Sequence, residues 1–321
     1  MDRSVNRNAA LFGVININKP EGITSRDVVN RVQKLVRPEK CGHAGTLDPM
    51  ATGVLLVCVG PATRLISYLQ DTTKVYEADF LLGQTSNTDD ITGEVASVEL
   101  KASPPARKSV QAALDQMTGS IAQVPPSFSA VHVNGRRAYD LARRGEAVEL
   151  VAREVQIDSI EIIRYEWPQL TVKVSCGSGT YIRSIARDLG EALGCGGLMS
   201  RLVRTRVGRF SITEALDADT ISTETLQDHL EPASTITNAL SQYRCTDADR
   251  TMLLCGKAVP VDRDRLVLID RSRIAGPSTE DGPPDHEQVA LWGEEDGQLW
   301  AVGEISRSMK TIHPRLVFVR P

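Results

Sequence analysis

Apolar and polar residues alternate over positions 12–18, and the turn sequence Pro20-Glu21-Gly22 follows this stretch. Thr24-Ser25 then offers N-cap residues for an amphipathic stretch over 26–36, which Pro38 ends. This pattern predicts a strand, a turn and a helix. The next apolar run, 53–59, fits either a buried strand or the start of a helix, because periodicity alone does not separate the two.

Further along the chain, short alternating runs and longer amphipathic runs follow one another irregularly. The predicted strands cover 75–82, 131–133, 155–163 and 170–175, and the predicted helices cover 109–117, 138–144 and 182–193. Gly194 closes the last of these helices. Since no regular strand–helix–strand repeat is present, we expect a mixed α+β fold on a largely antiparallel sheet.

A second unit is indicated from about residue 240. Its strand-like runs are short and separated by turn residues, which is typical of a small β-rich barrel; they cover 265–269, 289–292, 299–305 and 316–319. A stretch rich in Pro, Gly and acidic residues, 275–288, predicts a mobile loop. We therefore expect three parts: an N-terminal extension over 1–10, a large domain over 11–238 and a small domain over 239–321.

Composition narrows the class of protein. The chain has 321 residues and 41% hydrophobic content, enough for a buried core. No apolar run approaches the ~18 residues of a membrane span, and no secretory signal is evident, so we expect a cytoplasmic protein without a membrane partner. The six cysteines are scattered, and no metal-ligand spacing, P-loop or dinucleotide fingerprint is present. We expect no metal and no cofactor.

Charge is unevenly distributed along the chain. Residues 1–210 carry 26 Lys+Arg against 22 Asp+Glu, a balance of +4, whereas residues 211–321 carry 11 against 19, a balance of −8. Six arginines lie close together at the end of the first part, at positions 183, 187, 201, 204, 206 and 209. Such a cluster suits contacts to phosphates, although a solvated charged face is the simpler interpretation of the cluster alone.

The segment Gly42–Gly53 is the most unusual part of the sequence. It contains three glycines, His43 and an Asp48-Pro49 step, so its backbone is tightly turned and two polar side chains lie on a loop. Aspartate before proline is also a common helix cap. The segment by itself therefore leaves a cap and a catalytic carboxylate as alternatives for Asp48.

The order of several motifs resembles the TruB-type pseudouridine synthases. The resemblance covers about residues 11–213 and is weaker beyond. The matching motifs are Lys19-Pro20-Glu21-Gly22, the loop from His43 to Gly53, Lys74-Val75-Tyr76, Gly179-Thr180-Tyr181-Ile182-Arg183 and Arg201-Leu202-Val203-Arg204.

The resemblance implies an enzyme that converts one uridine of the tRNA T-loop, conventionally numbered 55, into pseudouridine. Asp48 matches the family's essential aspartate and would act either as a nucleophile at the sugar or as a base at C2′. The other matches have implied roles as well. Arg183 would pair with Asp48, Tyr76, Tyr181 and Leu202 would surround the uracil, His43 would help displace the neighbours of the flipped nucleotide, and Lys19 and Pro20 would form a structural motif.

The implied partner is tRNA, bound by its T-loop and T-stem, and we expect the protein to act as a monomer. Arg201, Arg204, Arg206 and Arg209 would contact the RNA backbone, and the C-terminal unit resembles the PUA-like RNA-binding domains appended to this family. Two alternatives are a guide-dependent synthase acting on ribosomal RNA and a non-catalytic RNA chaperone. The complete set of Asp48, Tyr76 and Arg183 argues against a purely binding role. The short N-terminal extension and the acidic C-terminal unit favour the stand-alone enzyme over the guide-dependent one.

Overall fold

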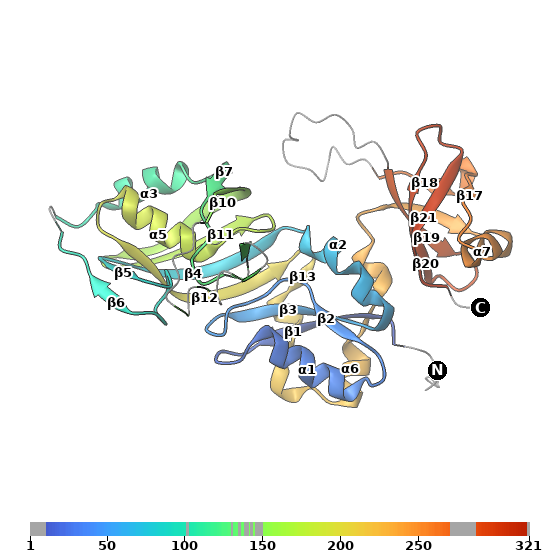
Figure 1. Ribbon diagram of the computed structural model, residues 1–321, viewed down its shortest axis with the longest axis horizontal. Coiled ribbons are helices and arrows are strands. Elements are labelled where there is room, and N and C mark those ends of the chain that lie inside the picture. Colours follow the sequence, from blue (N-terminus) through green and yellow to red (C-terminus); the bar gives the residue numbers. More distant parts are fainter. Residues whose placement is uncertain are drawn as a thin grey trace.

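A computed structural model describes residues 11–100, 103–129, 131–133, 136–137, 141, 144, 150–269 and 287–319. It contains a large sheet and a smaller C-terminal sheet (Figure 1). The predicted extension over 1–10 and most of both the predicted helix over 138–144 and the predicted loop over 275–288 lie outside the described residues.

The large sheet is mixed and mostly antiparallel, as the pattern predicted. Its main path runs β14 (Leu216–Asp217), β1 (Gly13–Lys19), β3 (Thr52–Val59), β12 (Gly197–Val207), β4 (Lys74–Leu82), β11 (Gln169–Cys176), β10 (Arg153–Glu166) and β7 (Gly119–Gln123). Three short strands attach beside this path, namely β2 (Cys41–His43), β13 (Phe210–Ser211) and β15 (Glu231–Pro232). Along the main path only β1–β14 and β3–β12 are parallel.

Helices pack against both halves of this sheet. Helix α1 (Ser25–Leu35) begins at Thr24, whose side chain forms a capping box with Asp27, and it buries three valines in the core shared with β1 and β3. Helices α3 (Arg107–Asp115) and α5 (Ile182–Ala192) pack into the core of the other half. Gly194 follows α5 with φ of +66°, which confirms the predicted helix end.

The alternation of apolar and polar residues left β3 undecided and did not predict β12, and both are central strands of the large sheet. The apolar run 53–59 forms β3, which pairs along its length with β1 and is almost wholly buried. Strand β12 lies between β3 and β4, yet the pattern did not predict it as a strand. Its arginines interrupt the apolar run, because some of them face solvent and one faces the interior.

The remaining elements are short. They comprise η1 (Gly60–Leu65), α2 (Ile66–Gln70), β5 (Gln84–Ser86), β6 (Val95–Ser97), β8 (His132–Val133), β9 (Arg136–Arg137), η2 (Ile212–Glu214), η3 (Ala218–Thr220), α6 (Thr223–His229) and η4 (Ala233–Ile236). Among the described residues, no helix combines the length and the apolarity that crossing a bilayer requires.

The C-terminal unit is β-rich, as predicted. Its sheet runs β17 (Val259–Pro260), β21 (Thr311–Val317), β20 (Leu299–Ile305), β19 (Glu287–Gly293), β16 (Ser241–Cys245) and β18 (Leu266–Val267), joined by α7 (Asp247–Leu254) and η5 (Arg263–Arg265). The strand predicted over 316–319 begins earlier, at Thr311. Neither β16 nor α7 was predicted from the pattern.

The two units share an apolar contact. The rings of Phe12 and Phe318 lie 5.0 Å apart, and the Arg64 guanidinium lies 5.1 Å from the centre of the Phe318 ring. Arg64 also donates a hydrogen bond of 2.8 Å to the carbonyl oxygen of Val317. One continuous apolar cluster joins residues of β3, η1 and α2 to residues of the C-terminal sheet.

Candidate active site

Asp48 lies on the loop between β2 and β3, and no helix follows it. The Ala51 amide donates to the Asp48 carbonyl oxygen at 3.0 Å, which closes a four-residue turn with Pro49 in its second position. The alternative interpretation of Asp48 as a helix cap is therefore wrong. Its side chain stays 35% exposed, so the carboxylate is accessible.

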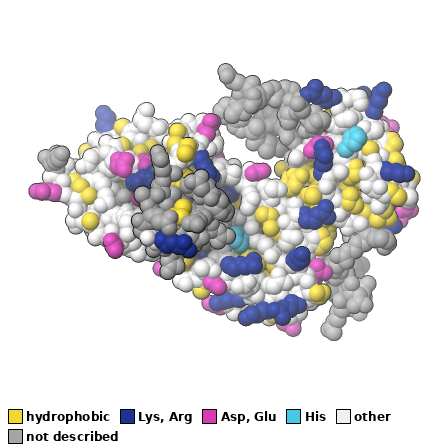
Figure 2. All heavy atoms as spheres, in the orientation of Figure 1, with side chains coloured by type: hydrophobic (Ala, Val, Ile, Leu, Met, Phe, Trp, Pro, Cys, Tyr) yellow, Lys and Arg dark blue, Asp and Glu magenta, His cyan; other side chains and the backbone are white. Residues whose placement is uncertain are grey.

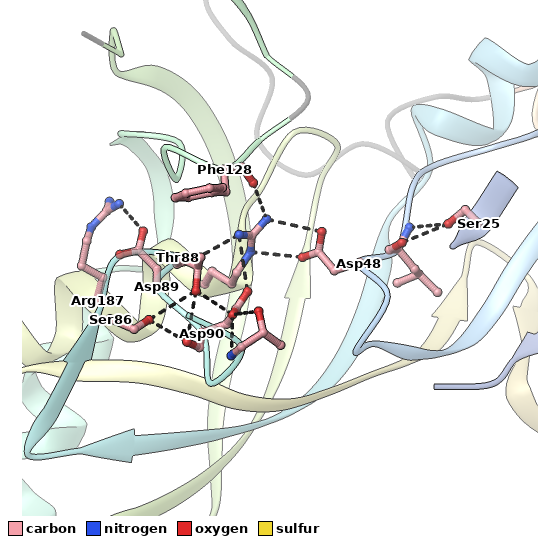
Figure 3. A network of polar contacts seen from close by, with 11 residues as sticks. Ser25, Asp48, Ser86, Thr88, Asp89, Asp90, Phe128 and Arg187 are labelled. Atoms are coloured by element: carbon pink, nitrogen blue, oxygen red, sulfur yellow. Dashed lines mark hydrogen bonds and ion pairs between the residues drawn. The ribbon is translucent and has the colours of Figure 1, made fainter. Parts of the chain in front are cut away.

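Arg183, in the first turn of α5, pairs with Asp48. Figure 3 labels Asp48 together with Thr88, Asp90 and Phe128, which contact the same arginine. The Nε of Arg183 lies 3.1 Å from Asp48 Oδ2, and its Nη1 lies 3.5 Å from Oδ2 of the buried Asp90. Arg183 also donates to the carbonyl oxygens of Thr88 and Phe128, each at 3.1 Å. These four contacts fix the plane of the guanidinium, so it can hold Asp48 in one orientation.

The electrostatics around Asp48 act in opposite directions. Burial raises the pKa of its carboxyl, Arg183 and Lys19 lower it, and Asp90 raises it, leaving a pKa above that of an ordinary aspartate. Two carboxylates thus share one arginine. The pKa of Asp48 therefore depends on Arg183 and on Asp90.

A pocket of about 580 Å³ opens beside Asp48. It lies where β4, β12 and the start of α5 meet, and its wall combines charged groups with aromatic and aliphatic side chains. Six of the predicted site residues line it together: Asp48, Tyr76, Tyr181, Arg183, Leu202 and Arg204. A pocket with apolar faces and a few polar groups suits one planar base and its sugar.

The backbone of Tyr181 is held by the buried Gln123. The Gln123 side chain accepts a hydrogen bond from the Tyr181 amide at 2.8 Å and donates one to its carbonyl oxygen at 3.1 Å. Tyr181 is the residue at which α5 begins. The end of β7 therefore fixes both Tyr181 and, two residues later, Arg183.

His43 lies at the end of β2, near the pocket but not among its lining residues. Burial lowers the pKa of its imidazole, and the charges of Arg204 and Arg26 lower it further, so the ring is neutral at neutral pH. Its Nδ1 has no hydrogen-bond partner among the described residues. The imidazole therefore keeps one buried polar atom without a partner in the described part of the chain.

Lys19 is fully buried next to the Asp48 loop. Its Nζ donates to the carbonyl oxygens of Pro20 at 2.8 Å and Pro49 at 3.2 Å, and the Gly22 amide donates to the same Pro49 oxygen at 2.9 Å. Burial lowers the pKa of Lys19 to about 8, although the charge of Asp48 opposes this shift. Lys19 and Pro20 thus hold the residue that follows Asp48, as a structural motif would.

The arginines of β12 and its following turn do not form one surface. Arg201 is 53% exposed and lies 3.4 Å from Asp79, Arg209 is 56% exposed and lies 3.6 Å from Glu231, and Arg206 is also exposed. Arg204 is only 1% exposed. The expectation that Arg204 contacts RNA phosphates is therefore wrong, because its position on β12 turns the side chain into the protein with Leu202.

Several groups of the site were not identified from the sequence. Asp90, Gln123 and Lys74 all touch the site or support its residues, and the carbonyl oxygens of Thr88 and Phe128 complete the shell around Arg183. Lys74 lies in the matched motif Lys74-Val75-Tyr76, and the paired acids at 89–90 were a second signal. Their partner lies more than ninety residues away in the sequence, so no local pattern connects them.

Replacing Gly53 by alanine should destabilise the protein by at least about 3 kcal/mol, because Gly53 has φ of +101° and an added Cβ would lie 2.3 Å from the Arg204 carbonyl oxygen. Gly119→Ala is a matched control, since Gly119 has φ of +92° and open space around it; it should lose only about 1–2 kcal/mol. Denaturant unfolding measures both. Equal losses would show that the close backbone approach at Gly53 carries no energy.

Family comparison identifies the class of this site. The model of the TruB family pseudouridylate synthase N-terminal domain matches residues 33–182, and that of the tRNA pseudouridylate synthase B C-terminal domain matches residues 183–243. No group of three or more potential metal-ligating side chains lies together in the part of the chain that the structure describes.

Similar proteins agree with these matches. "tRNA pseudouridine synthase B" of Acaryochloris marina is 41% identical over 258 residues, covering 78% of this chain and 88% of that protein; its namesake in Thermobifida fusca is 48% identical over 220 residues, covering 66% and 75%. A solved structure of a Cbf5-Nop10-Gar1 complex matches 97% of this chain and 86% of that one, with a TM-score of 0.70 and 26% identity. The chain therefore belongs to the TruB family of pseudouridylate synthases and is an enzyme of that class.

Proposed function

We propose that this enzyme isomerises the uridine conventionally numbered 55 in the tRNA T-loop to pseudouridine. The observation that carries the proposal is the Asp48–Arg183 pair at the wall of a pocket large enough for one flipped nucleotide. The relatives that share 41–48% identity are named for a tRNA-modifying reaction, which supports tRNA as the substrate.

The reaction needs a carboxylate beside the sugar. The N1–C1′ bond of uridine breaks, the detached uracil turns, a C5–C1′ bond forms, and the C5 proton is lost while N1 gains one, so no atom enters or leaves overall. Asp48 would serve either as a nucleophile at the sugar or as a base at C2′. Tyr76, Tyr181 and Leu202 would enclose the free base between the two steps, and neutral His43 would help displace the neighbours of the flipped nucleotide, whose extraction costs about a few kcal/mol.

The RNA would reach the site along a basic surface. Figure 2 shows Lys and Arg side chains on the face around α1. Separately, Arg201, Arg206 and Arg209 are exposed on β12 and the turn that follows it. We assign these three arginines to phosphates of the T-stem and T-loop.

The same proposal includes a division of the chain into a catalytic domain over 11–238 and a PUA-like RNA-binding domain over 239–321. It also includes a monomeric state and a cytoplasmic location.

Guide-dependent action on ribosomal RNA is the weaker alternative. One solved structure that matches 97% of this chain is a Cbf5-Nop10-Gar1 complex, and another is titled as an H/ACA RNP bound to a substrate RNA. Their identity to this chain is 25–26%, well below that of the tRNA pseudouridine synthases B. The higher identity favours tRNA.

Incubation of the pure protein with an unmodified tRNA transcript, in chelator and without added cofactor, should give one pseudouridine at position 55. Chemical mapping of pseudouridine along the transcript measures the product and its position. A transcript with cytidine at position 55 is the matched control and should yield none. Modification at another uridine, or dependence on an added guide RNA or metal ion, would contradict the proposal.

A further inference from the structure

Arg204 joins the two ends of the loop that carries Asp48. Its Nε donates to the carbonyl oxygen of Val54 at 2.7 Å, and its Nη2 donates to that of Gly45 at 3.0 Å. Asp48 lies between these two acceptors in the sequence. A single planar guanidinium therefore sets the separation between the start and the end of the catalytic loop.

The backbone of Arg204 holds the same loop end from a second direction. Strand β12 runs parallel to β3 here, with Arg204 opposite Gly53, and the space for a side chain at Gly53 is filled by the Arg204 backbone. The large sheet changes from one half to the other at this short pairing. Any shift of β12 against β3 would thus move the Asp48 loop as well.

Arg204 also lies beside Tyr76, its cross-strand partner on β4. Burial raises the pKa of the Tyr76 hydroxyl, whereas the charge of Arg204 and a hydrogen bond from it counter that rise. Both residues line the pocket. Arg204 therefore contacts both ends of the loop that carries Asp48 and also lies beside Tyr76 on β4.

A buried guanidinium is expensive without a carboxylate partner, and no ion pair joins Arg204 to an acid in the described part of the chain. The backbone carbonyl oxygens of Val54 and Gly45 accept its hydrogen bonds instead. An apolar side chain would fill this space at lower desolvation cost. The charge and the forked geometry of the Arg204 guanidinium thus serve to hold the loop carbonyls in place, and not only to fill the space.

We infer that Arg204 is a positioning residue, which fixes the Asp48 loop and Tyr76 relative to one another in the wall of the pocket that would hold the target nucleotide. The inference rests on the proposed function, because it concerns the geometry of that reaction. It replaces the phosphate-binding role that the sequence suggested for this arginine.

The test compares Arg204→Lys and Arg204→Gln with Arg206→Gln, an exposed arginine two residues along the same strand. Single-turnover rate at saturating enzyme, tRNA affinity over a range of salt concentrations, and a melting curve are measured for each. Lysine keeps the charge but cannot donate to both carbonyls in one plane, so its rate should fall about 10- to 100-fold with affinity changed less than about twofold. Glutamine should lose more rate than lysine. Arg206→Gln should instead weaken binding and reduce the salt slope by about one.

Three outcomes would overturn the inference. Wild-type rates in both Arg204 variants would show that the hydrogen bonds from Arg204 to the two ends of the Asp48 loop have no effect on the reaction. Weaker binding with a reduced salt slope would make Arg204 a phosphate contact. If even Arg204→Lys fails to fold, the role of Arg204 is structural only. The same holds if the variants have lower melting temperatures but reach the wild-type rate at temperatures where they are folded. An inactive wild-type enzyme on the tRNA transcript would instead refute the proposed function, so the two failures are distinguishable.

Discussion

Asp48→Asn should lower the single-turnover rate of pseudouridine formation by about three orders of magnitude or more and leave tRNA affinity nearly unchanged. The amide keeps the size of the side chain but can act neither as a nucleophile nor as a base. Arg183 would keep its contact with Asp90, so the fold should tolerate the change. Quench-flow turnover, filter binding and a melting curve measure the three quantities.

Asp188→Asn is the matched control for this substitution. Asp188 also pairs with an arginine and its side chain is 34% exposed, close to the 35% of Asp48, but it does not line the pocket. It should retain the wild-type rate. Near-normal turnover by a folded Asp48→Asn enzyme would refute the assignment of Asp48 in either chemical role.

Arg183→Met should cause the second largest loss, because it removes the cation that two carboxylates share. Breaking a buried ion pair on one side costs about 3–5 kcal/mol, and here the buried Asp90 is left without its partner. We expect a rate at least about 100-fold lower at neutral pH, since Asp48 would be present but no longer oriented. Single-turnover kinetics over pH and denaturant unfolding measure both effects.

The pH profile separates this account from a general loss of structure. Arg183 lowers the pKa of Asp48, so its removal should move the acid limb of the rate toward higher pH. Arg187→Met, one turn further along α5, is the control, because Arg187 pairs with Asp89 and Asp188 and leaves Asp48 untouched. An acid limb at the wild-type position in a folded Arg183→Met enzyme would contradict the coupling of the two side chains.

Local patterns in the sequence predicted most elements of the fold but not the centre of the large sheet. Residues 26–36 carry a cap, an amphipathic face and a stop, so their helix follows from local information. The run 53–59 became a strand only because β1 and β2 pair with it, and those pairings join distant segments. The sequence did not predict strand β12, because arginines interrupt its apolar residues. Only the fold shows that some of these arginines are exposed and that Arg204 is buried.

The same limit applies to the site. The motif order singled out Asp48, Tyr76, Tyr181, Arg183 and Leu202, and these residues line one pocket, while their roles stay predictions. It could not separate Arg204 from Arg201 or Arg206, because the chemistry of the three side chains is identical and only their tertiary surroundings differ. Asp90 escaped notice for a related reason: a buried acid and an exposed acid look alike until the fold places a guanidinium beside one of them.

The apolar cluster that joins the large sheet to the C-terminal unit limits how the chain can be divided. Phe12, Leu65 and Tyr68 pack with Phe318 and its neighbours in one apolar cluster. Residues of both units therefore bury this surface together. A chain cut before β16 would leave those side chains in water and gain a surface prone to self-association. The segment 60–70 begins at this shared core and ends at the pocket with Gln70, so one short helical stretch links the contact between the two units to the wall of the site.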